Sequence, residues 1–447
     1  MTDIKLDQTK KSLLKRYLLL GTPRFGTNIV LTIVDFALLT LYSTGFKLPA
    51  WQTFLATSLG KISIALSEFL LGWLSDAKYT KWGRRKPYLI ILSPLLGISF
   101  IFLLLPNRFL PISNTNALFI WLLVWDIIFQ ASFGVATVHN AWMAEQFEVK
   151  DRPKASQFIN LFIYAGAGVG QIFTLVILTD FALKVKFNPS LVPNEFLLCV
   201  LIFGILTVQL FYIVAILMPT EPHYKIDSDL ITNLKSIVKN KNYLSFNLMQ
   251  GFASIAWAIV TPTMLAFLTA VLGFSGWVFY IGGGIIIIGV LIFLYLWRLF
   301  IEKLGKKKSL LILFLFAIVV LPFTLISLIP MESYILYGII FIIGVVAAIG
   351  GWNLFPYIVY ADLAEDNEKS TGELKAGLYR GFSSIILNIF QAIGLAFSSV
   401  ISFLLGDYLF YIWWGPICSI ILIGAYFYSK KFIKIDFTWE KNKKTVI

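Results

Sequence analysis

The sequence predicts an all-α membrane protein of twelve transmembrane helices arranged as two six-helix bundles. Three observations predict this class. The chain of 447 residues is 58% hydrophobic and only 14% charged, and its charges lie between long apolar runs. Each run has the roughly 20 residues that a helix needs to cross a bilayer. The runs are expected to be helices, because lipid-facing backbone must bond within its own segment and no barrel-like alternation is present.

The apolar runs are expected to cross the bilayer one after another. They fall at 25–45, 51–74, 88–105, 117–144, 157–182, 194–218, 244–271, 275–299, 309–329, 333–360, 376–405 and 408–429. The longest polar interruption divides them six and six. We therefore expect an N-terminal tail at 1–24, a first bundle at 25–218, a central linker at 219–243, a second bundle at 244–429 and a C-terminal tail at 430–447.

Lysine and arginine predict the orientation of the spans. If the N-terminus is cytoplasmic, the cytoplasmic tails, loops and adjoining span ends hold all of the 37 lysines and arginines except Lys47, Lys61, Arg108, Lys184 and Lys186. Positively charged loops stay on the cytoplasmic side, so both termini are expected in the cytoplasm, with the protein in the cell membrane. The net charge of +13 lies between spans rather than along one polar face, which argues against nucleic-acid binding.

Nothing in the chain predicts an enzyme, a cofactor or a metal site. Cys199 and Cys418 both lie inside apolar runs, which supports neither a disulfide framework nor a cysteine metal site. His139 and His223 are far apart in the sequence. The Asp-Ser-Asp sequence at 227–229 could hold a metal-bound diphosphate, but no second acidic cluster accompanies it, and a solvated linker explains it more simply. No filter loop indicates a channel.

Two basic loops occupy corresponding places in the two halves. Asp76 and Gly83-Arg84-Arg85-Lys86 lie between the second and third runs, and Gly305-Lys306-Lys307-Lys308 follows the eighth run. A juxtamembrane lipid-binding patch would explain such a loop. The pattern Gly-x-x-x-Asp followed by Gly-Arg-Arg-Lys also resembles the loop between helices 2 and 3 of major facilitator superfamily transporters, whose halves are parallel repeats.

A second stretch narrows this resemblance. It combines Ala361-Asp362 with further acids, Thr371-Gly372 and Gly377-Leu378-Tyr379, and is similar to the loop 10–11 signature of the glycoside–pentoside–hexuronide:cation symporters, the melibiose-permease group. Phe25-Gly26 and the segment 145–152 extend the likeness over most of the chain. Sucrose transporters are the nearest competing relatives. The resemblance implies a secondary transporter that moves a sugar or glycoside by alternating access at a site between the bundles.

Charged residues inside the spans are candidates for ion coupling, because burying them is costly without a function or a partner. Lys61 and Glu68 are two turns apart on one helix face, and Asp35 lies in the first span. The resembled family has two cation-binding acids in the second span; Glu68 matches one, and Ile64 replaces the other. A single carboxylate suits a proton better than sodium, which remains the alternative ion. A structural Lys61–Glu68 pair is the simpler explanation.

Amide and aromatic residues within the spans predict a site for a neutral polyol, because amides bind hydroxyls and flat rings pack on sugar faces. In the fourth span, Asp126, Gln130, Thr137 and Asn140 form a stripe at helical spacing. Resemblance and position together give these substrate-binding candidates: Asn28, Asn140, Trp142, Asn160, Tyr164, Gln250, Trp257, Trp352, Asn353, Tyr357, Asn388 and Gln391. Some of them could simply join helices. A lysolipid or amphiphile carrier would use a similar uncharged aromatic lining, and an uncoupled facilitator is the other alternative.

Loop charges are candidates for a gate at the cytoplasmic surface. We expect Asp76 with Arg84 and Arg85 in the first half, and Asp362 and Glu365 in the second, to latch the outward-facing state. The expected partners are therefore a small-molecule substrate, a proton or sodium, and the lipid bilayer. The protein is expected to be a monomer.

Overall fold

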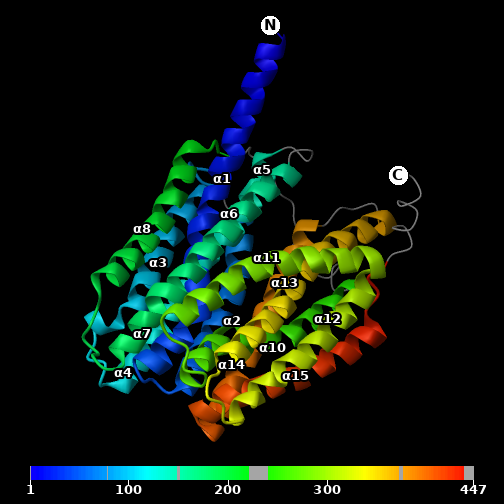
Figure 1. Cartoon of the computed structure of the whole chain (residues 1–447). Helices are drawn as coiled ribbons and strands as arrows, with labels where there is room; N and C mark the ends of the chain where they lie inside the picture. The colour runs from blue at the N-terminus through cyan, green and yellow to red at the C-terminus, as the bar shows by residue number, and fades with distance from the viewer. Residues whose placement is uncertain (1, 78, 148–151, 221–239, 372–375, 437–447) are drawn as a thin grey trace. The chain divides into compact units, whose positions relative to one another are not determined.

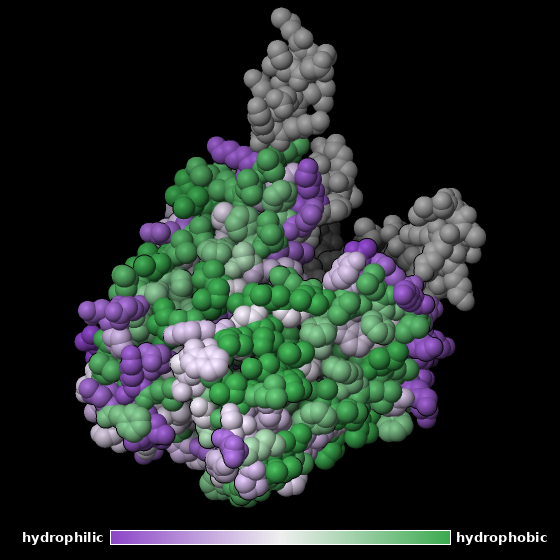
Figure 2. Space-filling view, in the orientation of Figure 1, coloured by the Kyte–Doolittle hydropathy of each residue, from purple (hydrophilic) through white to green (hydrophobic). Residues whose placement is uncertain are grey.

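The described part of the chain is almost entirely helical. The computed structural model describes all residues except 1, 78, 148–151, 221–239, 372–375 and 437–447 (Figure 1). Within that part, twelve helices are long and apolar enough to cross a membrane. The structure therefore confirms the predicted all-α class and the twelve spans. On the face seen in Figure 2, apolar side chains cover much of the sides of the helices, as a lipid-facing surface requires.

The chain forms two compact units. One unit holds Met1–Leu48 and Leu59–Asp227, and the other holds Pro49–Ser58 and Ser228–Ile447. The first unit contains α1 (Thr2–Leu39), α2 (Ala50–Ala77) from Leu59 onward, α3 (Lys86–Leu104), α4 (Thr115–Phe133), α5 (Val135–Gln146), α6 (Arg152–Phe173), α7 (Thr179–Val185) and α8 (Asn194–Leu217). The π-helical segments η1 (Thr40–Gly45) and η3 (Thr174–Leu178) and the 3₁₀ segment η2 (Pro106–Arg108) join or extend them.

The second unit repeats the packing of the first. Its helices are α10 (Lys241–Ala270), α11 (Trp277–Leu304), α12 (Lys306–Val320), the 3₁₀ segment η4 (Leu321–Leu328), α13 (Ile335–Thr371), α14 (Ala376–Leu405) and α15 (Asp407–Phe432). In the first unit α1 packs against α6 and α8, and in the second unit α10 packs against α14 and α15. These are the first, fifth and sixth spans of each half, as parallel repeats predict.

Glycine allows the closest of these helix contacts. A Cβ on Gly166 of α6 would lie 2.3 Å from the carbonyl oxygen of Phe25 in α1, and one on Gly394 of α14 would lie 2.6 Å from the carbonyl oxygen of Ile255 in α10. Both contacts join the fifth span of a half to its first. Small residues are the usual means of close approach between membrane helices.

The first helix begins earlier than the sequence suggested. We expected a polar tail up to residue 24, but α1 starts at Thr2 and the apolar span at Leu13. Tyr17 and Leu20 are buried, so this part of α1 packs against the protein. Helix α1 also passes through Pro23, which cannot bond the carbonyl of Leu19. The Thr22 hydroxyl donates to that carbonyl instead, at 2.8 Å.

Helix α13 likewise continues past the expected end of its span at residue 360, to Thr371. The residues from Ala361 to Glu365 include neither glycine nor proline, so nothing in the local sequence stops the helix.

Candidate functional site

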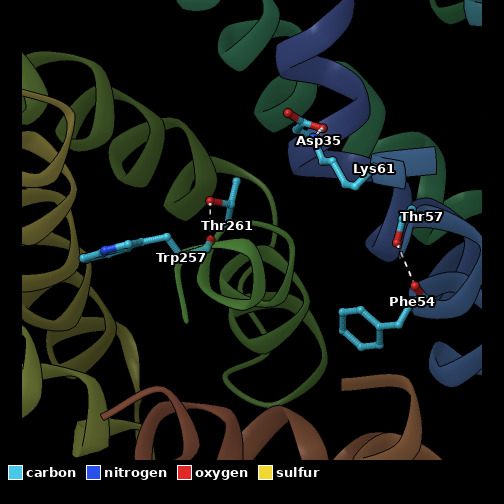
Figure 3. Close-up of polar contacts among 6 residues, drawn as sticks. All are labelled: Asp35, Phe54, Thr57, Lys61, Trp257 and Thr261. Atoms are coloured by element: carbon cyan, nitrogen blue, oxygen red, sulfur yellow. Dashed lines mark hydrogen bonds and ion pairs between the residues drawn. The ribbon is translucent and has the colours of Figure 1, made fainter. Parts of the chain in front are cut away.

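The charged centre of the first unit joins α1 to α2. Lys61 Nζ donates a hydrogen bond to Asp35 Oδ1 at 2.9 Å and forms an ion pair with it (Figure 3). The side chain of Lys61 is 13% exposed and that of Asp35 is 33% exposed, so the pair is largely enclosed on the lysine side. Charges within a membrane-spanning bundle cost free energy and mark sites where ions or substrates pass.

Glu68 lies two turns further along α2 and is half-buried. The interpretation of Lys61 and Glu68 as partners came from their spacing on one helix. The structure shows Lys61 bound to Asp35, which is 26 residues away in the sequence. Spacing along one helix says nothing about a neighbouring helix that approaches the same side chain, and here that helix is α1.

The other candidates in the first unit differ in exposure. Asn28 is buried, and its amide donates to the Arg24 carbonyl at 2.8 Å. Trp142 is fully buried, with the ammonium of Lys86 6.0 Å from its ring centroid. Tyr164 and Asn140 are exposed, and Asn160 is half-buried. Asn28 therefore already has a backbone partner, whereas the side chains of Asn140 and Tyr164 reach the surface of the unit.

The second unit brings two of the predicted tryptophans together. The rings of Trp257 on α10 and Trp352 on α13 stack with centroids 5.9 Å apart and planes at 24°. Trp257 is 5% exposed, and its indole nitrogen is buried with no acceptor among the described residues. One turn further along α10, the Thr261 hydroxyl donates to the Trp257 carbonyl at 3.1 Å (Figure 3). The two rings thus form a buried aromatic contact, and the Trp257 indole N–H is a donor with no acceptor among the described residues.

A polar cluster lies two turns before Trp257 on the same helix. The Tyr360 hydroxyl lies within hydrogen-bond distance of Gln250 Oε1 and of Asn247 Oδ1, the latter at 2.7 Å, and can donate its one proton to either. Gln250 and Trp257 are seven residues apart and therefore share a face of α10. Sequence reasoning identified Gln250 but gave Tyr360 no role, since Tyr360 lay at the expected end of its span and its partners are on another helix.

The remaining substrate candidates of the second unit are only partly defined. Asn388 is buried on α14, and its amide donates to the Ser384 hydroxyl at 3.3 Å. Gln391 is half-buried, and Asn353 is exposed on α13. The side chain of Tyr357 is outside the described residues. The exposed Asn353 is open to a ligand, whereas Asn388 already has a partner on its own helix.

The gating candidates lie at the helix ends, within their own units. Arg84 and Arg85 are buried, and Arg85 Nη1 donates to the Ser75 hydroxyl at the end of α2. Asp362 pairs with Lys306 at the start of α12, with 2.6 Å between Oδ2 and Nζ. The side chains of Asp76 and Glu365 are outside the described residues. The described contacts of Arg85 and Asp362 thus join helices of a single unit.

The backbone amides of Lys306 and Lys307, which begin α12, are bound by a carboxylate from the C-terminal segment. Asp436 Oδ1 accepts hydrogen bonds from both amides, at 2.9 and 3.3 Å. The preceding Gly305 has φ of +83°, a conformation that favours glycine. Sequence reasoning missed this cap because Asp436 is 130 residues from Lys306.

Comparisons with known proteins agree with this architecture. A family model described as MFS/sugar transport protein matches residues 19–409. A crystal structure of a D-xylose-proton symporter is 16% identical, with a TM-score of 0.64 over 95% of this chain and 98% of that chain. A crystal structure of the nucleoside transporter NupG is 16% identical, with a TM-score of 0.62 over 93% of this chain and 99% of that chain.

A third similar structure is a bacterial homolog of the human lysosomal transporter Spinster, in an inward-facing and occupied conformation. It is 15% identical, with a TM-score of 0.67 over 96% of this chain and 98% of that chain. At these identities the likeness concerns the fold. No curated protein matches the sequence.

Proposed function

This chain belongs to the family of MFS/sugar transport proteins, and we propose that it moves a sugar or glycoside across the cell membrane by alternating access, coupled to a proton. The major facilitator fold and the multi-pass membrane character are established by the family and the twelve spans. We further propose that both termini lie in the cytoplasm, that the two bundles extend over residues 25–218 and 244–429, and that the protein is a monomer.

The stacked pair Trp257–Trp352 carries the substrate part of the proposal. It offers a rigid apolar face of the kind that packs on a sugar ring, and the unsatisfied indole N–H of Trp257 can donate to a hydroxyl. Gln250, on the same face of α10, adds an amide that both donates and accepts hydrogen bonds. In the first unit, Asn140 and Tyr164 are exposed groups that could bind further hydroxyls. A site with aromatic faces and amides suits an uncharged polyol.

The enclosed pair Lys61–Asp35, with Glu68 further along α2, supports coupling to a proton. Sodium requires several oxygen ligands. The carboxylate of Asp35 is already bound by the ammonium of Lys61, so it is not available as one of them. A carboxylate can exchange a proton with water when its side of the bundle opens, and an adjacent lysine influences that exchange. We therefore propose that Asp35, Lys61 and Glu68 form the coupling group.

Thermal unfolding of the detergent-solubilised protein with a panel of ligands tests the substrate class. A ligand that binds only the folded state raises the unfolding temperature, by an amount that grows with its concentration relative to Kd. We expect stabilisation by one or a few mono- or disaccharides and glycosides, lost in a Trp257→Ala variant. Stabilisation by lysolipids with no response to any sugar would contradict the proposal and favour an amphiphile carrier.

A further inference from the structure

Asp126, on α4, is a carboxyl group that the proposed coupling group does not include. Its side chain is fully buried in the first unit. Among the described residues, neither of its carboxylate oxygens has a hydrogen-bond partner, and the Gln130 amide oxygen one turn away has none. An anion buried without hydrogen-bond donors costs several kcal/mol or more. Such a group is stable when it carries a proton or when a cation reaches it.

The backbone of α2 brings Asp126 next to the only lysine within the second span. A Cβ on Gly60 would lie 1.9 Å from Asp126 Oδ2, so the carboxyl rests directly on α2 at the residue before Lys61. Any side chain at position 60 would displace the carboxyl. Lys61 and Asp35 are the charged groups near Asp126. Tyr42 also faces Asp126, but its hydroxyl donates to the Leu103 carbonyl at 2.9 Å.

We propose that Asp126 is the alternative partner of Lys61, and that a proton on Asp126 determines which carboxylate the lysine binds. This inference rests on the proposed proton coupling and adds Asp126 to the groups that take part in it. In the described state, Lys61 is bound to Asp35 and Asp126 is the neutral acid. When Asp126 releases its proton to water, its carboxylate takes the Lys61 ammonium from Asp35. No covalent bond other than the O–H bond of Asp126 forms or breaks.

The exposures of the two acids make this exchange feasible. Asp35, with 33% of its side chain exposed, can replace the ammonium with water. Asp126, fully buried, has no such replacement and must hold either its proton or Lys61. The exchange requires two unequal carboxyls. Asp35 can be left without Lys61 because water reaches it, whereas the Asp126 carboxylate cannot.

Infrared difference spectroscopy between high and low pH, on the full-length protein in lipid, tests the inference without a substrate. We expect a protonated-carboxyl C=O band that disappears in Asp126→Asn and persists in Glu68→Gln. Asp180→Asn is the matched control, because Asp180 forms an exposed pair with Lys184 on its own helix. A band that persists in Asp126→Asn, or no band in the wild type, would overturn the inference.

A second variant covers the case in which Asp126→Asn does not fold. Lys61→Met removes the alternative partner, so Asp126 should keep its proton and its band should no longer change with pH. A band that titrates as in the wild type would contradict the switch. Because these readouts need no ligand, failure to find a transported sugar would count against the proposed function alone. If a sugar is transported, Asp126→Asn should reduce its accumulation ratio to one while exchange continues.

Discussion

Lys61 of α2 and Asp35 of α1 are joined by a 2.9 Å ion pair inside the first unit. Replacing Asp35 with Asn leaves a lysine that is 13% exposed without its carboxylate. Because both side chains are partly exposed, and Lys61 only slightly, the cost in the free energy of unfolding should lie between the costs for exposed and for buried ion pairs, at about 1–3 kcal/mol. Thermal unfolding of Asp35→Asn, Lys61→Met and the double variant measures it.

The double variant should be more stable than the sum of the two single effects predicts, because it removes both charges together. Simple additivity would mean that the pair contributes nothing to the folded state.

Replacing Trp257 with Phe tests the substrate surface. The change keeps a ring that can stack on Trp352 and removes the unsatisfied indole N–H. A lost hydrogen bond of about 0.5–1.5 kcal/mol should weaken sugar binding roughly 2- to 13-fold. Trp414→Phe is the matched control. The indole nitrogen of Trp414 is also buried without a described acceptor, but its ring packs on Phe267 and Phe341, which are not candidate residues. Equal losses in both variants would argue against a direct contact at Trp257.

Asp436 should stabilise the start of α12. Its carboxylate accepts from the first two amides of that helix, as an N-capping residue does. Asp436→Ala should lower the free energy of unfolding by about 1 kcal/mol, whereas Asp436→Asn, which can still accept, should remain close to the wild type. Chemical or thermal unfolding compares the two variants. A similar loss in both would indicate that charge, rather than capping, is responsible.

Arg85→Ala should weaken the proposed latch at the end of α2. Arg85 is 3% exposed and donates to the Ser75 hydroxyl. Its replacement therefore removes a buried charge-assisted hydrogen bond that holds the turn between α2 and α3. We expect the population to shift towards the inward-open state, with faster labelling of cysteines introduced on the cytoplasmic side. Labelling rates equal to those of the wild type would contradict a role in gating.

The sequence could predict what depends on each helix alone. Twelve spans follow from run length and hydropathy, because a bilayer admits only helices of that length. The seven-residue spacing of Gln250 and Trp257 likewise predicts, from one helix alone, that they share a face of α10. Three contacts join residues that are far apart in the chain: the ion pair of Asp35 with Lys61, the contact of Asp126 with Gly60, and the capping of α12 by Asp436. Such contacts depend on which helices pack together, which local patterns do not specify.

The same distinction explains the two helices that extend further than expected. The polar start of α1 and the acidic end of α13 resemble tails and loops in composition. Local hydropathy marks where a helix can lie in lipid, but a helix continues until a residue or a contact ends it.

Glu68→Gln separates transport from coupling. The variant cannot release a proton at position 68, so uphill accumulation should be lost while exchange of substrate between two filled compartments continues. Radiolabelled sugar flux in proteoliposomes measures both modes. Uphill accumulation that survives in Glu68→Gln would mean that Glu68 is not the coupling carboxyl. Loss of uphill accumulation in both Glu68→Gln and Asp126→Asn would mean that Glu68 and Asp126 both take part in coupling.

Uptake of a stabilising sugar into proteoliposomes, driven by one ion gradient at a time, tests the central claim most directly. A pH gradient without sodium should drive accumulation of the sugar above its external concentration in the wild type, and collapse of the gradient with a protonophore should return the ratio to one. Accumulation driven by a sodium gradient at equal pH, or a ratio of one under every gradient, would contradict proton-coupled transport.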